Sequence, residues 1–283
     1  MERDPLRSIS QTGVFVLFYL LTITVMAMPL YWVGGQLVET TVTPFIGSLA
    51  ATFLCWKIYD ETPLPHAGLK LDRRGGRDLW MGVAAGIAGA TLALVPGVAL
   101  RIARFTPVAD AHVSFNTSAF VTILIFCGAA GEEMLFHGFA FQSLMIGLGP
   151  FAAIFPVGVI FGLLHMGNPD ATWLSTFNTI GFGIIFGCAL YRTCSLWLPV
   201  GLHFGWNIAL PFFGAKISGI TMRVTGYEMT WNADPLWSGG AYGPEGSLLT
   251  TGVLALMLLF VWKYPFPHRA SEWSQPVESE PAV

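Results

Sequence analysis

Six side chains able to move protons or donate hydrogen bonds lie within stretches that are otherwise strongly apolar. They are Glu132, Glu133, His137, His165, His203 and Asn207. Carboxylates and imidazoles are common general acids and bases, and amides can donate to a developing oxyanion. An ionisable group in an apolar layer costs about 2.5–3.5 kcal/mol or more unless it meets a partner or water. We therefore expect these six residues to gather at one polar site.

The spacing of these residues assigns them to shared helix faces. Glu133 and His137 are four positions apart, so on a helix they can pair directly. Glu132 is turned by about 100° from its neighbour, so it can face a cavity while Glu133 is held by the histidine. His203 and Asn207 are also four apart and share a face. No serine or cysteine accompanies the histidines as a convincing nucleophile, which favours chemistry by an activated water.

The composition shows what surrounds these residues. Of 283 residues, 54% are hydrophobic and 11% are charged, against roughly 25% charged in a soluble domain. A water-soluble globule of this size could not cover so much apolar surface, and a disordered chain would be apolar-poor. The net charge of −3 and the lack of a Lys/Arg-rich run exclude a nucleic-acid binder. The sequence therefore predicts an integral membrane protein.

The apolar stretches predict an all-α polytopic transmembrane helical bundle of about eight spans. The expected spans are 12–34, 41–58, 79–100, 118–146, 150–166, 173–191, 196–214 and 247–263. Continuous apolar runs favour helices over a barrel, whose strands alternate. The first run is longer than a signal-peptide core, so we expect it to stay uncleaved. We expect residues 1–283 to form one membrane domain, with a polar tail at 264–283.

Eight spans place both termini on one side of the bilayer, and the basic residues indicate which side. That side would carry Arg3, Arg7, Lys57, Lys70, Arg73, Arg74, Arg77, Arg192, Lys263 and Arg269, and the other side Arg101, Arg104, Lys216 and Arg223. Cytoplasmic loops are enriched in Lys and Arg. The sequence therefore predicts cytoplasmic termini.

Three pairs of glycines spaced by four predict close helix packing near the polar residues. The pairs are Gly158/Gly162, Gly183/Gly187 and Gly201/Gly205.

The expected depths of His165 and His203 in the membrane differ. At 1.5 Å per residue, His165 would lie roughly 22 Å along its span from the cytoplasmic end and His203 about 10 Å along its own. Strong tilt, a long fourth helix, or breaks near Pro156 and Pro199 are needed to bring them together.

The motifs resemble those of the CAAX protease and bacteriocin-processing (Abi) family of intramembrane endopeptidases. That family carries Glu-Glu-x-x-x-Arg, Phe-x-x-x-His and His-x-x-x-Asn motifs on successive transmembrane helices. The corresponding residues are Glu132 and Glu133 with His137, Phe161 with His165, and His203 with Asn207. The resemblance covers roughly 118–262, and the segment 239–247 looks like the approach to the last helix in bacterial members. One departure is that His137 stands where the family has arginine.

The resemblance implies hydrolysis of peptide bonds in membrane-associated substrates, including prenylated CAAX-like proteins. It implies that Glu132 is the general base, that His165 helps to hold the water, and that His203 and Asn207 stabilise the oxyanion. Glu133, His137 and Phe161 would support them. It favours a mechanism without a cofactor, although one glutamate and two histidines are also an acceptable zinc set.

Two other functions fit parts of the sequence. A non-catalytic membrane scaffold or immunity protein of the same fold would explain the loss of the family's arginine at His137. A small-solute or proton transporter could use buried Glu and His as a relay, but the sequence lacks an internal repeat. The expected partners are a membrane-associated peptide or protein and the lipid bilayer, and the expected location is the bacterial inner membrane. The oligomeric state does not follow from the sequence.

Overall fold

The computed structural model describes residues 4–59, 68–109 and 113–266, so the predicted tail lies almost wholly outside the described residues. The described chain is mostly helical. Its helices are α1 (Pro5–Tyr59), α2 (Arg73–Ala99), α3 (Phe115–His137), α4 (Phe139–Leu148), α5 (Pro150–Leu164), α6 (Trp173–Thr193), α7 (Trp197–Phe212), α8 (Pro235–Ser238) and α9 (Leu248–Lys263), with short 3-10 turns η2 (His165–Gly167) and η3 (Pro244–Gly246). Each of the eight predicted ranges is helical over most of its length.

Five of the described helical stretches are long and apolar enough to cross a membrane. They are Pro5–Tyr59, Arg73–Ala99, Phe115–Leu148, Pro150–Gly167 and Trp173–Thr193. Within α1, Gly35 has a left-handed φ of 70° and divides the helix into two arms, which match the first two predicted spans. Helices α7 and α9 have 16 residues each. The chain is an integral membrane protein, and the count of eight spans stays a prediction.

The fourth predicted span is not one continuous helix, because the chain breaks at Gly138 between α3 and α4. A side chain at Gly138 would place its Cβ 2.1 Å from the Met134 carbonyl oxygen, so only glycine fits there. A second break follows at Gly149, where φ is 98°. Pro156 stays within α5, and Pro199 lies in the first turn of α7. The interruptions that help to align the polar residues are therefore at glycines rather than at those prolines.

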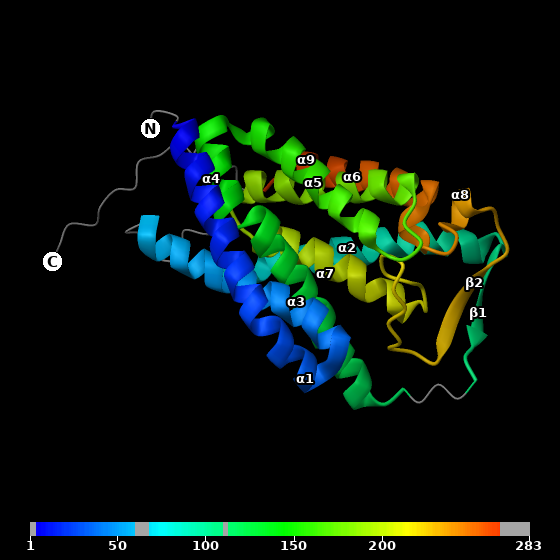
Figure 1. Cartoon of the computed structure of the whole chain (residues 1–283). Helices are drawn as coiled ribbons and strands as arrows, with labels where there is room; N and C mark the ends of the chain where they lie inside the picture. The colour runs from blue at the N-terminus through cyan, green and yellow to red at the C-terminus, as the bar shows by residue number, and fades with distance from the viewer. Residues whose placement is uncertain (1–3, 60–67, 110–112, 267–283) are drawn as a thin grey trace.

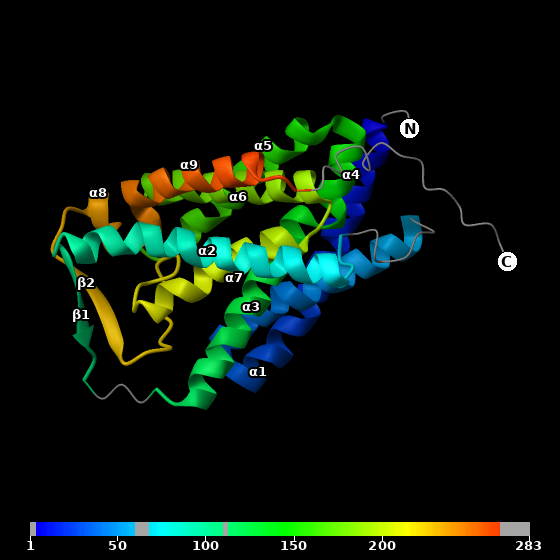
Figure 2. The same cartoon turned by 180° about the vertical axis from the view of Figure 1, so that it is seen from behind.

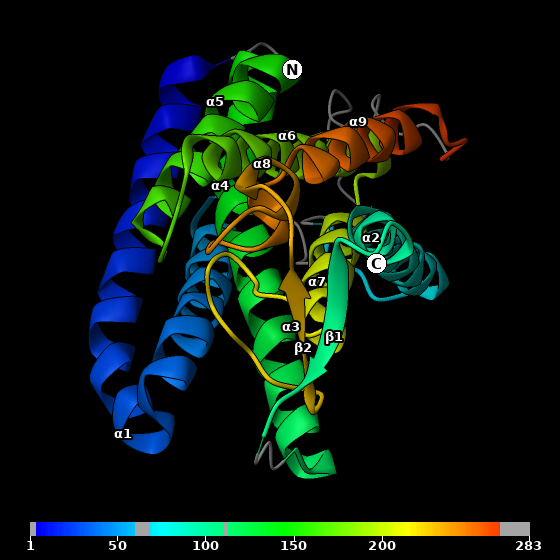
Figure 3. The same cartoon turned by 90° about the vertical axis from the view of Figure 1, so that its right-hand side faces the viewer.

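Two groups of helices cross one another. Helices α2, α6, α7 and α9 run in roughly the same direction, and α1 and α3 cross them obliquely (Figure 1). The view from behind shows α9 beside α6, with α2 lying along α7 (Figure 2). Seen along that group, the two arms of α1 and helix α3 stand upright at one side (Figure 3). The crossing brings α3, which carries the paired glutamates, against α7, which carries His203.

Glycines allow these helices to approach backbone to backbone. A Cβ at Gly82 or Gly86 of α2 would lie 2.5 or 2.3 Å from a carbonyl oxygen of α7. A Cβ at Gly201 or Gly205 of α7 would lie 2.3 Å from a carbonyl oxygen of α2. The close packing predicted for the Gly201/Gly205 pair is confirmed, and its partner strip on α2 has the same four-residue spacing. Between α5 and α6, Gly162 allows the same close approach, because a Cβ added there would lie 2.7 Å from the Ile180 amide nitrogen.

The described chain is mostly helical, as predicted, and it adds one short two-stranded ribbon that the sequence did not predict. Strands β1 (Ala103–Pro107) and β2 (Tyr227–Trp231) pair antiparallel, with Ala103 opposite Trp231. They lie together at the end of the molecule opposite α4 (Figure 1). Each strand has only five residues, and its partner is more than a hundred positions away, so neither polar stretch carries a local strand signal. The pairing ties the loop after α2 to the loop after α7.

Candidate active site

Glu132 sits at the point where α3 touches the second arm of α1. The preceding residue, Gly131, would place a Cβ 2.8 Å from the Phe45 backbone, so the two helices are in close contact there. The Glu132 side chain keeps 33% of its surface exposed. Its Oε2 lies 3.7 Å from His165 Nε2 and 3.9 Å from His203 Nε2. This oxygen has no hydrogen-bond partner within the described part of the chain. The three motifs therefore converge around one carboxylate oxygen.

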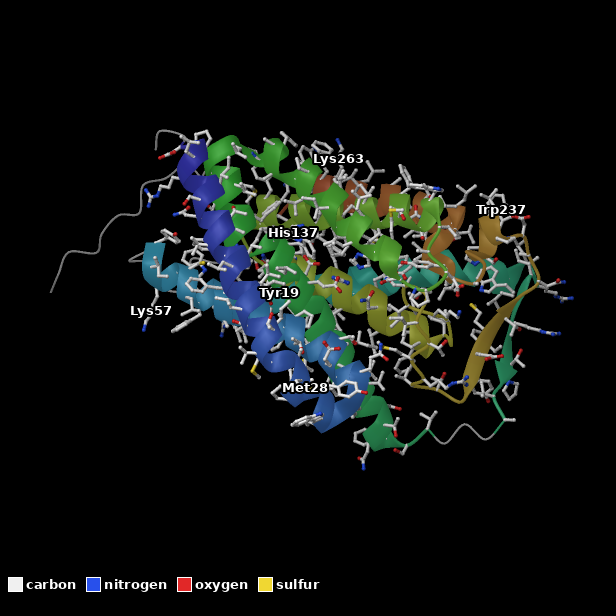
Figure 4. The ribbon with its side chains drawn as sticks, viewed as in Figure 1. Tyr19, Met28, Lys57, His137, Trp237 and Lys263 are labelled. Atoms are coloured by element: carbon white, nitrogen blue, oxygen red, sulfur yellow. The ribbon has the colours of Figure 1, made fainter. Side chains whose placement is uncertain are left out.

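The adjacent Glu133 has the opposite environment, because its side chain is fully buried. Its Oε2 accepts a hydrogen bond from His137 Nδ1 at 2.8 Å, and its Oε1 accepts one from His203 Nδ1 at 2.8 Å. The predicted pairing of Glu133 with His137 on one helix face is thus present. In addition, the same carboxylate reaches α7 and fixes the ring of His203. Figure 4 shows His137 among the helices in the interior of the molecule.

His165 is oriented by its own helix end. It follows the last residue of α5, and its Nδ1 lies 2.7 Å from the Phe161 carbonyl oxygen. A carbonyl oxygen can only accept, so Nδ1 carries the proton and Nε2 is the acceptor nitrogen of the neutral ring. The Phe161 ring packs on this imidazole with its centroid 4.6 Å away. The Phe-x-x-x-His spacing therefore sets both the tautomer and the direction of His165.

Aromatic rings hold His203 in place. The Phe186 ring stacks on the His203 imidazole with centroids 5.0 Å apart and an angle of 16°. The Phe161 ring meets the same imidazole edge-on at 6.1 Å. His203 is buried, so its ring has little freedom to turn. Because Glu133 holds Nδ1, the opposite nitrogen, Nε2, is directed toward Glu132.

A small cavity with room for about one water molecule adjoins the two imidazoles. Its walls are Phe161, His165, Thr179, Phe182, Phe186, His203, Trp206, Asn207, Ser218 and Glu245. Asn207, four residues after His203 on α7, reaches this cavity as its predicted role requires. Glu132 is not part of the lining, although its Oε2 is within 4 Å of both Nε2 atoms. The space is sufficient to hold a water molecule beside the imidazoles.

The structure adds a third carboxylate that the sequence reasoning did not single out. Glu245, in η3 just before α9, lines the cavity and is buried. Its Oε1 accepts from Trp206 Nε1 at 3.0 Å, and its Oε2 accepts from the Ser218 backbone N–H at 2.5 Å and its hydroxyl at 3.1 Å. Desolvation raises the pKa of Glu245 above its ordinary value, against the lowering effect of these donors. The only sequence signal was its segment, 239–247, which resembles the approach to the last helix of the family.

The structure thus brings Glu132, His165 and His203 together and places Glu133 with His137 and His203. Their catalytic roles remain predictions, as does the absence of a cofactor. Over residues 4–59, 68–109 and 113–266, no group of three or more His, Cys, Asp or Glu side chains is arranged to hold a metal ion. The site consists of a carboxylate beside two imidazoles in an apolar surrounding.

The described chain is thus a helical membrane protein with a polar centre of one carboxylate and two imidazoles. Residues 112–209 match the family model described as "Type II CAAX prenyl endopeptidase Rce1-like". This segment, about a third of the chain, contains α3 to α7 up to Ala209 and is similar to the Rce1-like domain of the CAAX protease and bacteriocin-processing family. Comparisons with curated proteins and with solved structures gave no match.

Proposed function

We propose that this chain is an intramembrane endopeptidase in which Glu132 activates a water to hydrolyse peptide bonds of membrane-associated substrates. The observation that carries the proposal is the position of Glu132 Oε2, 3.7 and 3.9 Å from two imidazole Nε2 atoms. These distances are too long for direct hydrogen bonds, and the buried Oε2 has no partner among the described residues, so a small separation of the three side chains would admit a water between them. A water held there donates one proton to Glu132 and one to the acceptor nitrogen of His165.

The remaining steps follow from the same positions. Glu132 takes a proton from the water while the oxygen of the water attacks the scissile carbonyl. Glu132 later delivers that proton to the leaving amine. Asn207 and a protonated Nε2 of His203 donate to the oxyanion that forms. Glu133 holds His203 from behind through Nδ1. Each residue that the family motifs identify therefore has a task that its position supports.

The non-catalytic alternative is favoured only by His137 in place of the family's arginine. The contact of His137 with Glu133 argues against it, because the imidazole donates to the carboxylate that holds His203. A supporting residue at position 137 must donate a hydrogen bond to Glu133, and His137 does so. We therefore regard His137 as a supporting residue in an active enzyme.

The orientation is part of the proposal. We place both termini in the cytoplasm of a bacterial inner membrane, following the distribution of Lys and Arg. Lys57, near the end of α1, and Trp237, in α8, lie toward opposite ends of the molecule (Figure 4), which is compatible with this orientation. The substrates are membrane-associated proteins or peptides, prenylated or not.

The test compares wild type with Glu132→Gln, using Glu228→Gln on the exposed face of β2 as the matched control. Each purified protein is reconstituted in liposomes with a panel of internally quenched peptides, and membrane peptides from cells expressing each variant are compared by proteomics. A general base contributes about 10²–10⁴-fold, so Glu132→Gln should lose at least about a hundredfold and Glu228→Gln less than twofold. Equal cleavage by wild type and Glu132→Gln would overturn the mechanism.

Two further measurements separate the alternatives. Activity that survives exhaustive chelation, in protein that analyses as metal-free, supports the metal-free glutamate mechanism over zinc. Proton-coupled flux in the same liposomes, abolished by Glu132→Gln in the absence of any cleavage, would favour the transporter. Thermal unfolding of each variant shows whether the protein is folded in each assay.

A further inference from the structure

Glu245 is a further carboxylate of the polar centre, and its hydrogen bonds hold it in one position. Its Oε1 accepts from Trp206 Nε1 at 3.0 Å, and its Oε2 accepts from the N–H and the hydroxyl of Ser218. Its backbone is held as well, because Asn178 Nδ2 donates to the Glu245 carbonyl oxygen at 2.8 Å. Each carboxylate oxygen thus faces an N–H group that can only donate, which favours the ionised form of the side chain.

The cavity places this carboxylate beside the imidazoles of the site. Glu245, His165 and His203 line the same small cavity, and the charge of Glu245 interacts electrostatically with both histidines. Trp206, the donor to Oε1, lies on α7 three residues after His203. Glu245 is therefore joined to the helix that carries this imidazole and also acts on it through the cavity.

Three carboxylates act on His203. Glu133 Oε1 accepts from its Nδ1 at 2.8 Å, and Glu132 Oε2 lies 3.9 Å from its Nε2. Glu245 acts on the same ring from η3. Several negative charges in an apolar surrounding are costly unless positive charge accompanies them. A proton on the His203 ring supplies such a charge, and nearby carboxylates favour the protonated form of an imidazole.

The other groups around Glu245 do not neutralise it. Among the ion pairs between described residues, none includes Glu245. Lys216 Nζ lies 3.6 Å from Asp170 and donates to a backbone carbonyl oxygen, and Tyr242 is a buried phenol with its pKa raised to about 12. Burial raises the pKa of Glu245, whereas the donors to its oxygens and the charge of His165 act against that rise. The compensating positive charge therefore falls to the imidazoles.

We propose that Glu245 is a positioning residue of the active site that acts through His203. Its charge supports the imidazolium form of His203, whose Nε2 donates to the oxyanion, and its hydrogen bond to Trp206 fixes the part of α7 that carries His203 and Asn207. Glu133 supports the same imidazolium at Nδ1, so two carboxylates from distant segments act on one ring. This role rests on the proposed peptidase function, but the protonation of His203 can be measured without a substrate.

The kinetic test measures kcat against pH in liposomes for wild type and two neutral variants, Glu245→Gln and Glu245→Met. Glutamine adds an amide donor beside Ser218 and methionine does not, so the two variants remove the charge with different local effects. Without the charge, the imidazolium is lost at lower pH. The alkaline limb of kcat should therefore move down by about 1 pH unit, the effect of a unit charge across a water-sized cavity at an effective dielectric constant of about 20.

Two control variants separate this effect from loss of structure. Glu245→Asp keeps the charge and should move the alkaline limb by less than half as much as the neutral variants. Glu228→Gln removes one charge from the exposed face of β2 and should leave the limb in place. A purely structural role of Glu245 predicts a lower thermal midpoint and less active enzyme, but an unchanged limb for the molecules that remain folded. An alkaline limb that stays in place in both neutral variants would refute the role in catalysis.

The second test uses NMR of protein with isotope-labelled histidine in nanodiscs, where the protonation of His203 is followed without substrate. Loss of a signal in His203→Gln identifies its ring. The pH midpoint of His203 should be lower in both neutral variants than in wild type. An unchanged midpoint, in an enzyme that Glu132→Gln inactivates, would refute the proposal and leave the peptidase standing. A lower midpoint, in a protein that cleaves no peptide, would support the coupling of Glu245 to His203 and refute the peptidase.

Discussion

Glu133→Gln tests whether the buried carboxylate acts through His203. In wild type, each oxygen of Glu133 accepts from a different imidazole at 2.8 Å. A glutamine has one accepting oxygen and one amino group that only donates. One imidazole must then move its proton to Nε2 in order to accept at Nδ1. If that ring is His203, it keeps a proton at Nε2 but is neutral, so the proposed contact with the oxyanion loses its positive charge.

The expected effect of Glu133→Gln on the rate follows from the loss of one hydrogen bond to the fully buried Glu133 carboxylate. Such a bond contributes about 1.5–3 kcal/mol, which corresponds to roughly ten- to hundredfold in rate. We expect this loss in kcat, with KM little changed, because Glu133 lies behind His203 and does not line the cavity beside the imidazoles. The pH dependence of kcat should also change, since the protonation of His203 no longer depends on a carboxylate at Nδ1.

The assay measures kcat, KM and the pH profile on reconstituted protein, with Glu228→Gln as control and thermal unfolding measured in parallel. A purely structural role predicts a lower thermal midpoint but an unchanged pH profile for the molecules that remain folded. A folded Glu133→Gln enzyme with kcat within twofold of wild type and the same pH profile would refute the proposed role of Glu133.

Four other changes test separate parts of the structure. Gly86→Ala should lower the thermal midpoint, because its Cβ would lie 2.3 Å from a backbone oxygen of α7, whereas Gly76→Ala on the same helix meets nothing within 4 Å and should not. His137→Arg should keep cleavage within about tenfold in the peptidase assay, and total loss would show a separate role for the imidazole. The pKa of Asp72 is lowered mainly by a backbone N–H of the first turn of α2. Ionised Asp72 therefore stabilises this turn at pH values above the ordinary aspartate pKa, and the stabilisation is lost as the pH falls through the lowered pKa. Hydrogen exchange of the turn should show this pH dependence in wild type but not in Asp72→Asn. Arg192→Lys should destabilise the C-terminal end of α9, where the guanidinium donates to three backbone carbonyls, as measured by exchange of its last turn.

Much of the site could be predicted from spacing because its contacts are local. The four-residue spacing of Glu133 and His137 required a shared helix face, and the structure has that contact. The spacing of Phe161 and His165 placed a carbonyl oxygen one turn before the imidazole. Such i, i+4 relations depend only on helix geometry, so a sequence determines them wherever a helix forms.

The features that were missed depend on contacts between distant segments. Glu245 lies in a polar loop, where a carboxylate is normally solvated, and only the packing of that loop against Trp206 and Ser218 buries it. The strand pairing also joins two distant loops. The break at Gly138 occurs in an apolar run that remains compatible with a single long helix. None of these features has a local periodic signal, so each required the three-dimensional arrangement.

The contrast between the two adjacent glutamates supports the assignment of the base. Glu133 is fully buried, and both of its oxygens are occupied by imidazole donors, so accepting a further proton would break a contact that holds the site together. The Glu132 side chain keeps a third of its surface exposed, and its buried Oε2 has no partner among the described residues, so a proton on that oxygen would break no hydrogen bond. Carboxylates of the same type take different roles when their environments differ in this way. The residue that is free to exchange a proton lies beside two imidazoles, and the residue that is not free fixes one of them.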